Sequence, residues 1–276
     1  MVQSPVEISA KTLSFAEYLV HKVEHGVRYE LDRGQLIEMP TTTGLHIKIC
    51  KFLTNEFLRY FVSQNLNLVA IEFTGVRTEE NTSRIPDTIV CKQSLWDNVC
   101  SRKGAAVLDF EEKPLLVVEV TSQNWRQDYT TKRAEYDAIG IREYWIVDPE
   151  RSRIQLCSKH AGKANYAIKD FFPGDNVQSA QFPDLILPVN RVLSPPDVDY
   201  LIREEKELRQ QLEQQMNAER QRADEERQRA DAEQALRQQL EQQMNAERQR
   251  ADAERQRAEQ LAQRLQALGI DPDTIN

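Results

Sequence analysis

The sequence has no aromatic residue after Tyr200. All tryptophans, tyrosines and phenylalanines lie in the first 200 residues, as do eight of the nine glycines, whereas the rest is almost entirely Glu, Gln, Arg, Ala and Leu. A segment without aromatic side chains cannot build a globular core alone, so the core belongs to the first part of the chain. About 195 residues are ample for one well-buried domain.

Cysteine pairs and long apolar runs are also missing. Cys50, Cys91, Cys100 and Cys157 form no CxxC pair, and their spacing fits neither a zinc site nor a disulfide framework, so reduced, half-buried thiols are expected. The N-terminus lacks the basic and apolar segments of a signal peptide. No stretch approaches the ~18 apolar residues of a membrane span. We therefore expect a soluble cytoplasmic protein without membrane contact.

A strong positive charge is absent as well. The net charge of −8 is shared equally, since residues 1–200 hold 23 Lys and Arg against 27 Asp and Glu, and residues 201–276 hold 13 against 17. This balance argues against a protein that coats nucleic acid by charge alone. A local basic rim or Mg²⁺ can still offset acidic residues in a site.

Cap and turn residues divide the first part into helices and strands, which predicts an α/β domain. Ser14-Phe-Ala-Glu17 predicts a capping box and a short helix to about His25. Alternating runs around Arg33-Gly34 predict a hairpin over 27–38. Further helices are expected at 44–64 and 128–139, the latter stopped by Gly140, with strands at 68–73, 88–91, 115–120 and 143–147 and a second hairpin at 153–157 and 165–169. The Pro-rich segment 193–197 marks the end of this domain, which we place at 1–195.

The tail is a duplicated heptad array, in which LRQQLEQQMNAERQRAD at 208–224 returns at 236–252, four heptads later. Leu212, Leu240, Leu261 and Leu268 occupy one seam of the frame but alternate there with glutamates. Coiled coils need apolar residues at both seam positions. A dimeric coiled coil through 201–268 and a lone charged helix therefore remain equal alternatives, with residues 196–268 as the helix and 269–276 as a short C-terminal tail.

The lone helix would be supported by ion pairs between residues four apart, such as Glu225 with Arg229 and Glu233 with Arg237.

Three charged residues of the first domain are not explained by local structure. Glu119 interrupts the apolar strand LLVVEV, and burying an unpaired carboxylate costs several kcal/mol unless a cation or donors compensate it. The alternative is that Glu119 faces solvent or an arginine at the strand end. Asp87 after Pro86 could be an ordinary turn residue, and Lys132 an exposed helix lysine. Tyr136 should share a helical face with Lys132 and Asp128.

The order of these residues resembles the PD-(D/E)XK nuclease superfamily: Pro-Asp entering one strand, then a strand bearing Glu, then a lysine. Over about residues 10–195 the chain is similar to the Uma-two family of putative restriction endonucleases of cyanobacterial type. The residues that carry the resemblance are Tyr29-Glu-Leu-Asp-Arg-Gly34, His46, Arg84-Ile-Pro-Asp87, Leu115-Leu-Val-Val-Glu-Val-Thr-Ser122, Asp128-x-x-x-Lys132-x-x-x-Tyr136 and Gly140-Ile-Arg-Glu-Tyr-Trp-Ile-Val-Asp-Pro149.

The resemblance implies a restriction-endonuclease-like mixed β-sheet flanked by helices, and a homodimeric endonuclease that hydrolyses DNA with Mg²⁺, or with Mn²⁺ instead. Asp87 and Glu119 would bind the metal, and Lys132 would position the water and the phosphate. Glu30 would lie near the site and His46 at its rim, although these two can also be explained as an exposed hairpin residue and a residue at a helix start. Tyr136 would either pack against its neighbours or touch a phosphate of the DNA backbone.

Two departures from the family pattern bear on this assignment. The superfamily places its lysine two residues after the strand glutamate, where this chain has Thr121, so Lys132 would have to reach the site from the following helix. After that strand the family has Ser-Pro-Ser, whereas this chain has Ser122-Gln-Asn124. The alternatives are a nuclease fold that binds without turnover and acts through its tail, and a scaffold whose heptads recruit a partner.

Overall fold

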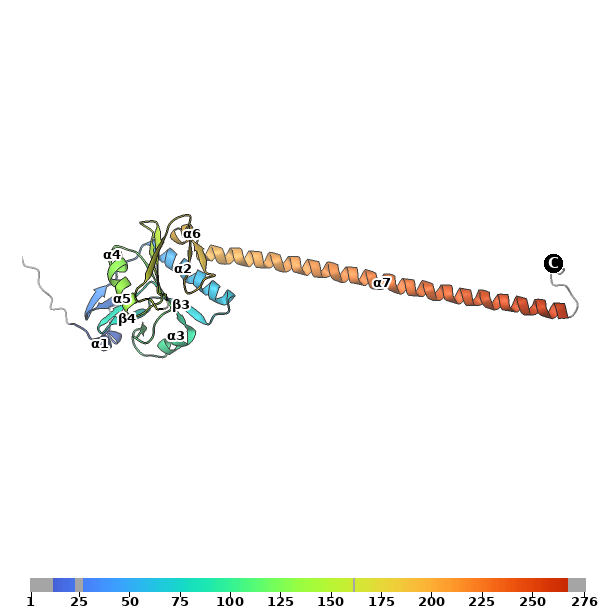
Figure 1. Ribbon diagram of the computed structural model, residues 1–276, viewed down its shortest axis with the longest axis horizontal. Coiled ribbons are helices and arrows are strands. Elements are labelled where there is room, and N and C mark those ends of the chain that lie inside the picture. Colours follow the sequence, from blue (N-terminus) through green and yellow to red (C-terminus); the bar gives the residue numbers. More distant parts are fainter. Residues whose placement is uncertain (1–11, 23–26, 161, 268–276) are drawn as a thin grey trace, which may run out of the picture. The chain divides into compact units, whose positions relative to one another are not determined.

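The computed structural model describes residues 12–22, 27–160 and 162–267 (Figure 1). The chain divides into two compact units, Met1–Ile202 and Arg203–Asn276. Among the described residues, no helix combines the length and the apolar character needed to cross a membrane.

The larger sheet of the first unit has six strands in the order β11-β10-β9-β8-β6-β3. Only β8 and β9 pair in parallel, and the other neighbours are antiparallel. Their bounds are β3 Leu68–Glu72, β6 Thr88–Lys92, β8 Leu116–Val120, β9 Glu143–Asp148, β10 Arg153–Ser158 and β11 Ala167–Phe171. The central strands β8 and β9 are buried along their whole length, in keeping with the apolar runs Leu116–Val118 and Trp145–Val147 that they contain.

Helix α2 (Gly44–Ser63) packs its apolar side into the largest core cluster, which includes Phe52, Phe57 and Phe61. Trp145 of β9 belongs to the same cluster and contacts Phe57 edge to face. The small ribbon β12 (Asn176–Gln178) and β13 (Ile186–Pro188) and helix α6 (Val189–Leu193) complete this layer, while α3 (Gln93–Cys100) follows β6. The arrangement is the predicted mixed sheet flanked by helices.

A second sheet of five strands has the order β2-β1-β5-β4-β7. Its strands are β1 Tyr29–Asp32, β2 Gln35–Glu38, β4 Gly75–Glu79, β5 Thr82–Arg84 and β7 Val107–Leu108. Strands β1 and β2 form the predicted hairpin, and its turn has positive φ at Arg33 and Gly34, 50° and 85°. Two consecutive positive φ values define the tight turn that suits the twist of paired strands.

The parallel strands β8 and β9 are joined by a helical crossover, as parallel pairing requires. The crossover is predicted as one helix over 128–139, but it consists of α4 (Trp125–Gln127), the π-turn η1 (Asp128–Lys132) and α5 (Arg133–Ala138). Gly140 ends it with φ +82°, and the amide of Ile141 donates to the carbonyl of Tyr136 at 3.0 Å. This is the predicted glycine stop.

Helix α1 (Phe15–Leu19) begins with the predicted capping box, in which Ser14 and Glu17 bond each other's backbone amides. It is shorter than predicted. The carbonyl of Leu19 accepts from the amide of Ala105, and the chain leaves the helix after Leu19. The predicted end at His25 lies outside the described residues.

Helix α7 (Val198–Ala267) is the predicted long C-terminal helix. Its first turn carries Val198 and Leu201, which are each 7% exposed and belong to the main core cluster. The compact first unit thus extends to Ile202, beyond the expected end at residue 195. Of the expected ion pairs along the helix, Glu233 and Arg237 form one at 2.7 Å.

Candidate active site

Asp87 lies between Pro86 and the first residue of β6, and both oxygens of its buried carboxylate are anchored. Oδ2 accepts a hydrogen bond of 2.7 Å from the amide of Val120 on the neighbouring strand β8. Oδ1 lies 2.8 Å from His46 Nε2, on the first turn of α2. Two separate elements therefore fix the orientation of this carboxylate.

Glu119 is the fourth residue of β8, and it is 4% exposed. Its Oε1 accepts hydrogen bonds from Lys132 Nζ at 2.9 Å and from the hydroxyl of Tyr136 at 3.1 Å. Within the described part of the chain no hydrogen bond engages Oε2, which leaves that oxygen available as a ligand. Glu119 thus faces a lysine inside the protein, and not solvent or an arginine.

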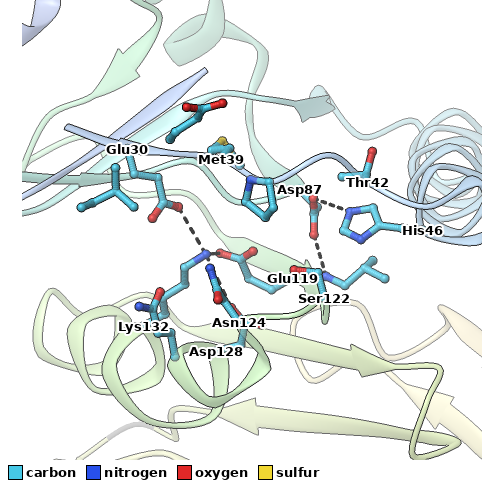
Figure 2. A pocket seen from close by; sticks show the side chains of 15 residues that line it. Glu30, Met39, Thr42, His46, Asp87, Glu119, Ser122, Asn124, Asp128 and Lys132 are labelled. Atoms are coloured by element: carbon cyan, nitrogen blue, oxygen red, sulfur yellow. Dashed lines mark hydrogen bonds and ion pairs between the residues drawn. The ribbon is translucent and has the colours of Figure 1, made fainter. Parts of the chain in front are cut away.

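Lys132 is 8% exposed and lies among three carboxylates. Besides Glu119, its Nζ pairs with Glu30 Oε1 at 3.2 Å and with Asp128 Oδ1 at 3.5 Å. Figure 2 shows the ammonium between the side chains of Glu30 and Glu119. Lys132 is therefore not an exposed helix lysine, since its three N–H groups can all be used inside the cluster.

The cluster places the carboxyl groups of Glu30, Asp87, Glu119 and Asp128 around the ammonium of Lys132. Burial raises the pKa of Glu119 well above its ordinary value, and Asp128, Asp87 and Glu30 raise it further while Lys132 lowers it. Burial likewise raises the pKa of Asp128 to about 6. Burial opposes the charge of Lys132, but the three carboxylates hold its pKa well above the ordinary value. A bound cation would favour the ionised forms of Glu119 and Asp128, as Lys132 does.

Glu30 comes from β1 and is held by a second ionic network. Its Oε1 accepts from the amide of Ile85 at 3.0 Å, and its Oε2 lies 3.5 Å from Arg84 Nη1. Arg84 is 3% exposed and bonds Glu135 of α5 at 2.6 and 2.8 Å. The five-stranded sheet and the crossover are thus tied together beside the site.

His46 and Cys50 lie four residues apart on α2 and are both buried. With Asp87 they form a group whose ligand atoms all lie within 4.8 Å of one another. The Nδ1 atom of His46 is among the few buried polar atoms of the described residues that have no hydrogen-bond partner. Burial, with Asp87 and other carboxylates, raises the pKa of the Cys50 thiol, so the thiol is neutral without a bound cation.

A pocket of about 60 Å³ is lined by the acidic cluster and by His46. Glu30, His46, Asp87, Glu119, Asp128 and Lys132 all line it, as Figure 2 shows. The volume exceeds the ~10–15 Å³ that a single water needs. It can hold an ion with part of its water shell, and its polar lining consists mainly of hard oxygen donors of the kind that Mg²⁺ prefers.

The structure brings all five predicted site residues, Glu30, His46, Asp87, Glu119 and Lys132, to this one pocket. Glu30 is 6% exposed, so the alternative of an exposed hairpin residue is wrong. His46 follows the helix cap Thr43, but it also bonds Asp87. Thr121, at the superfamily's lysine position, donates its amide to the carbonyl of Val147 and lies outside this pocket.

Three residues contribute to the site besides the five predicted ones. For Asp128 the sequence predicts only that it shares a helical face with Lys132. The spacing of four residues, which allows the two side chains to form an ion pair, is the signal that could have placed Asp128 in the site. Tyr136 is fully buried and donates to Glu119, so the expectation that it packs is confirmed and the alternative that it touches a phosphate is wrong. Cys50 was expected only to be a reduced thiol, and its spacing from His46 was the overlooked signal.

Comparisons with known proteins identify a family and several similar chains among the solved structures. The family model Uma2, described as "Putative restriction endonuclease", matches residues 15–190. One of the similar chains comes from a crystal structure of "a putative nuclease belonging to DUF820" from Anabaena variabilis. The match covers 60% of this chain and 89% of the chain in that structure, with 19% sequence identity and a TM-score of 0.48. No curated protein matches the sequence.

Proposed function

Because the chain belongs to the Uma2 family of putative restriction endonucleases, we propose that it is a Mg²⁺-dependent endonuclease that hydrolyses DNA phosphodiester bonds in the pocket of Asp87 and Glu119. The observation that carries the proposal is the meeting of Asp87, Glu119 and Lys132, from three separate elements, at one acidic pocket. The apolar strand β8 tolerates Glu119 because the ammonium of Lys132 compensates the charge of its carboxylate in part.

The donor set fits a hard divalent cation. Asp87 and Glu119 would hold it, since Asp87 is fixed from both sides and Glu119 keeps Oε2 unengaged. When bound, Mg²⁺ lowers the pKa of a coordinated water and stabilises the negative charge that develops on the phosphate. Mn²⁺ has similar ligand preferences and is expected to substitute.

The protein's own residues prepare the site. Tyr136 and Lys132 both donate to Oε1 of Glu119 and so orient its carboxylate. Lys132 is tied to three carboxylates, so it can position a water or a phosphate only by exchanging one of these partners. Glu30 and Asp128 would hold the ammonium close to its working position until then.

DNA binding by a chain with a net charge of −8 depends on local basic groups. The helix α4, which follows the pocket residue Asn124, carries Trp125 and Arg126. The guanidinium carbons of Arg126 and Arg151 lie 4.9 and 3.6 Å from the centre of the Trp125 ring. These two exposed arginines are the candidates for binding phosphates beside the site.

The direct test is nicking of supercoiled plasmid by the purified full chain, with Mg²⁺ and with EDTA. Nicking should require the cation and should fall on the order of 100-fold or more in Glu119→Gln and Asp87→Asn. Asp97→Asn, an exposed carboxylate of α3 outside the pocket, is the matched control and should match wild type.

Nicking that persists in Glu119→Gln would mean that the reaction occurs elsewhere. If the wild-type protein nicks no DNA form with either Mg²⁺ or Mn²⁺, the fold serves binding or scaffolding through its tail. Calorimetric titration of Mg²⁺ into wild type and Asp87→Asn separates loss of metal from loss of chemistry.

The tail is proposed to make the protein a homodimer through a coiled coil, so that two sites could serve two DNA strands. Its support is the duplicated heptad array and its seam leucines, of which Leu212, Leu240 and Leu261 are each more than half exposed. Light scattering of the full chain and of a chain ending at Ile202 tests this. If the particles of the full chain and of the shortened chain contain the same number of chains, dimerisation through the tail is contradicted.

A further inference from the structure

The first turns of α2 present a nitrogen and a sulfur ligand on one helical face. His46 and Cys50 are four residues apart, a spacing that places two side chains one above the other. Pairs with this spacing on a helix can chelate one metal ion. Asp87 adds a carboxylate from the start of β6, and the ligand atoms of all three residues lie within 4.8 Å of one another.

The buried imidazole gives independent support for a ligand at this place. His46 is 7% exposed, and only its Nε2 has a partner, Asp87 Oδ1 at 2.8 Å. Its Nδ1 is buried and has no hydrogen-bond partner among the described residues. A buried polar atom without a partner loses its hydration without compensation. A metal ion bound at Nδ1 would remove that deficit.

The chemistry of these donors differs from that of the acidic cluster. Glu30, Glu119 and Asp128 offer only carboxylate oxygens, whereas His46 and Cys50 offer imidazole and sulfur. Imidazole, thiolate and one carboxylate suit Zn²⁺ or Co²⁺, and Mg²⁺ rarely accepts sulfur. Asp87 belongs to both groups, and a shared carboxylate is a usual arrangement where two metal ions lie close together.

We propose that His46, Cys50 and Asp87 form a second metal site, selective for a thiophilic divalent cation such as Zn²⁺ or Co²⁺, beside the acidic pocket. Binding exchanges the Cys50 thiol proton for the metal and releases that proton to solvent. Because the ring nitrogen without a partner is Nδ1, the cation binds there, and Asp87 gives up its hydrogen bond with Nε2 to reach the cation. The inference rests on the geometry of these three residues and does not require the nuclease activity.

The test is Co²⁺ binding to the full chain, followed by absorption. A thiolate ligand gives a charge-transfer band in the near ultraviolet, which a site of carboxylates alone does not give. All samples carry Cys100→Ser, because Cys100 is the exposed cysteine. We expect a saturable band that Zn²⁺ abolishes and that an excess of Mg²⁺ leaves in place.

Cys50→Ser should abolish the band and weaken Co²⁺ binding by more than about tenfold, since loss of even an outer-shell partner has an effect of that size. Cys157→Ser, a fully buried thiol on β10, is the matched control and should keep the band. His46→Gln should weaken Co²⁺ binding similarly, and it provides the same evidence if Cys50→Ser does not fold. Tryptophan fluorescence checks the fold of each variant.

Absence of a band in the parent protein, or a band that survives in Cys50→Ser, overturns the second site. These outcomes are distinct from failure of the proposed nuclease, because no DNA is present. Mg²⁺-dependent nicking without Co²⁺–thiolate binding would remove only the second site. Co²⁺–thiolate binding without nicking would remove only the nuclease.

Discussion

Replacing Lys132 by methionine tests whether one ammonium keeps the acidic pocket folded. The side chain keeps a similar volume but can no longer form the ion pairs of 2.9, 3.2 and 3.5 Å with three buried carboxylates. Removing one partner of a buried ionic cluster leaves charge without compensation, at about 3–5 kcal/mol. We expect the free energy of unfolding to fall by that amount at pH 8 without divalent cations.

The loss should depend on pH in a defined direction. Without Lys132, Glu119 and Asp128 hold protons in the folded state at pH values where the unfolded chain has lost them. A carboxyl group whose folded pKa is raised makes stability fall as pH rises from its unfolded to its folded pKa. Lowering the pH from 8 to 5.5 should therefore restore part of the stability, by up to about 1.4 kcal/mol per pH unit and proton. The wild-type contribution of Lys132, whose pKa is raised, is lost only above its ordinary range.

The assay is urea unfolding followed by tryptophan fluorescence, because all three tryptophans lie in the first unit and report on it alone. Lys48→Met is the control. Lys48 pairs with Asp197 at 3.0 Å, and their side chains are 40% and 76% exposed, so about 0–1 kcal/mol is expected. Equal losses in the two variants at both pH values would refute the view that Lys132 compensates buried charge.

Buried or stacked charges and the end of the core give four further predictions. Burial raises the pKa of Asp128 to about 6, so the stability of the wild-type protein should fall as the pH rises from the ordinary pKa of an aspartate to 6. In urea unfolding, Asp128→Asn should be more stable than wild type by on the order of 1–3 kcal/mol at pH 7.5, and equally stable below pH 4. Glu143 accepts from Trp145, Ser179 and the amides of residues 180 and 181. Glu143→Gln replaces one accepting oxygen by an NH₂ group that faces a donor, so the free energy of unfolding should fall by about 1–3 kcal/mol in the same assay. A chain ending at Ile202 should unfold like wild type, whereas one ending at residue 195 lacks Val198 and Leu201 and should be roughly 2–5 kcal/mol less stable. Arg126→Gln combined with Arg151→Gln should reduce the salt slope of DNA binding by about one for each phosphate that is no longer neutralised, and an unchanged slope in anisotropy titrations with Ca²⁺ would exclude that role.

Much of the larger sheet could be predicted from the sequence, because its strands are apolar and separated by clear turn or cap residues. Strands β3, β6, β8, β9 and β10 lie within a residue or two of their predicted bounds, and α2 ends at Ser63 against a predicted Gln64. The second sheet was predicted only as its first hairpin. Strands β4 and β5 contain Thr, Glu, Arg and Ser, and they are held by pairing with distant segments. Local periodicity contains no such information.

The same distinction applies to the site. Glu119 stood out because a carboxylate inside LLVVEV conflicts with its surroundings, and Asp87 and Lys132 were connected to it by the order of the motif. Asp128 and Cys50 produce no local conflict, since each is ordinary on a helix. Their part in the site arises only when α2, β6, β8 and the crossover meet in space.

The π-turn at Asp128–Lys132 sets where the ammonium points. One extra residue is accommodated there, and the hydroxyl of Tyr144 donates a hydrogen bond of 3.1 Å to the carbonyl of Asp128. Adjacent residues of an α-helix are about 100° apart around its axis. Deleting Thr130 would restore ordinary α-helical winding and rotate Trp125 and Arg126 around the helix axis relative to Lys132. The π-helical turn therefore determines how the exposed arginine is oriented relative to the buried lysine.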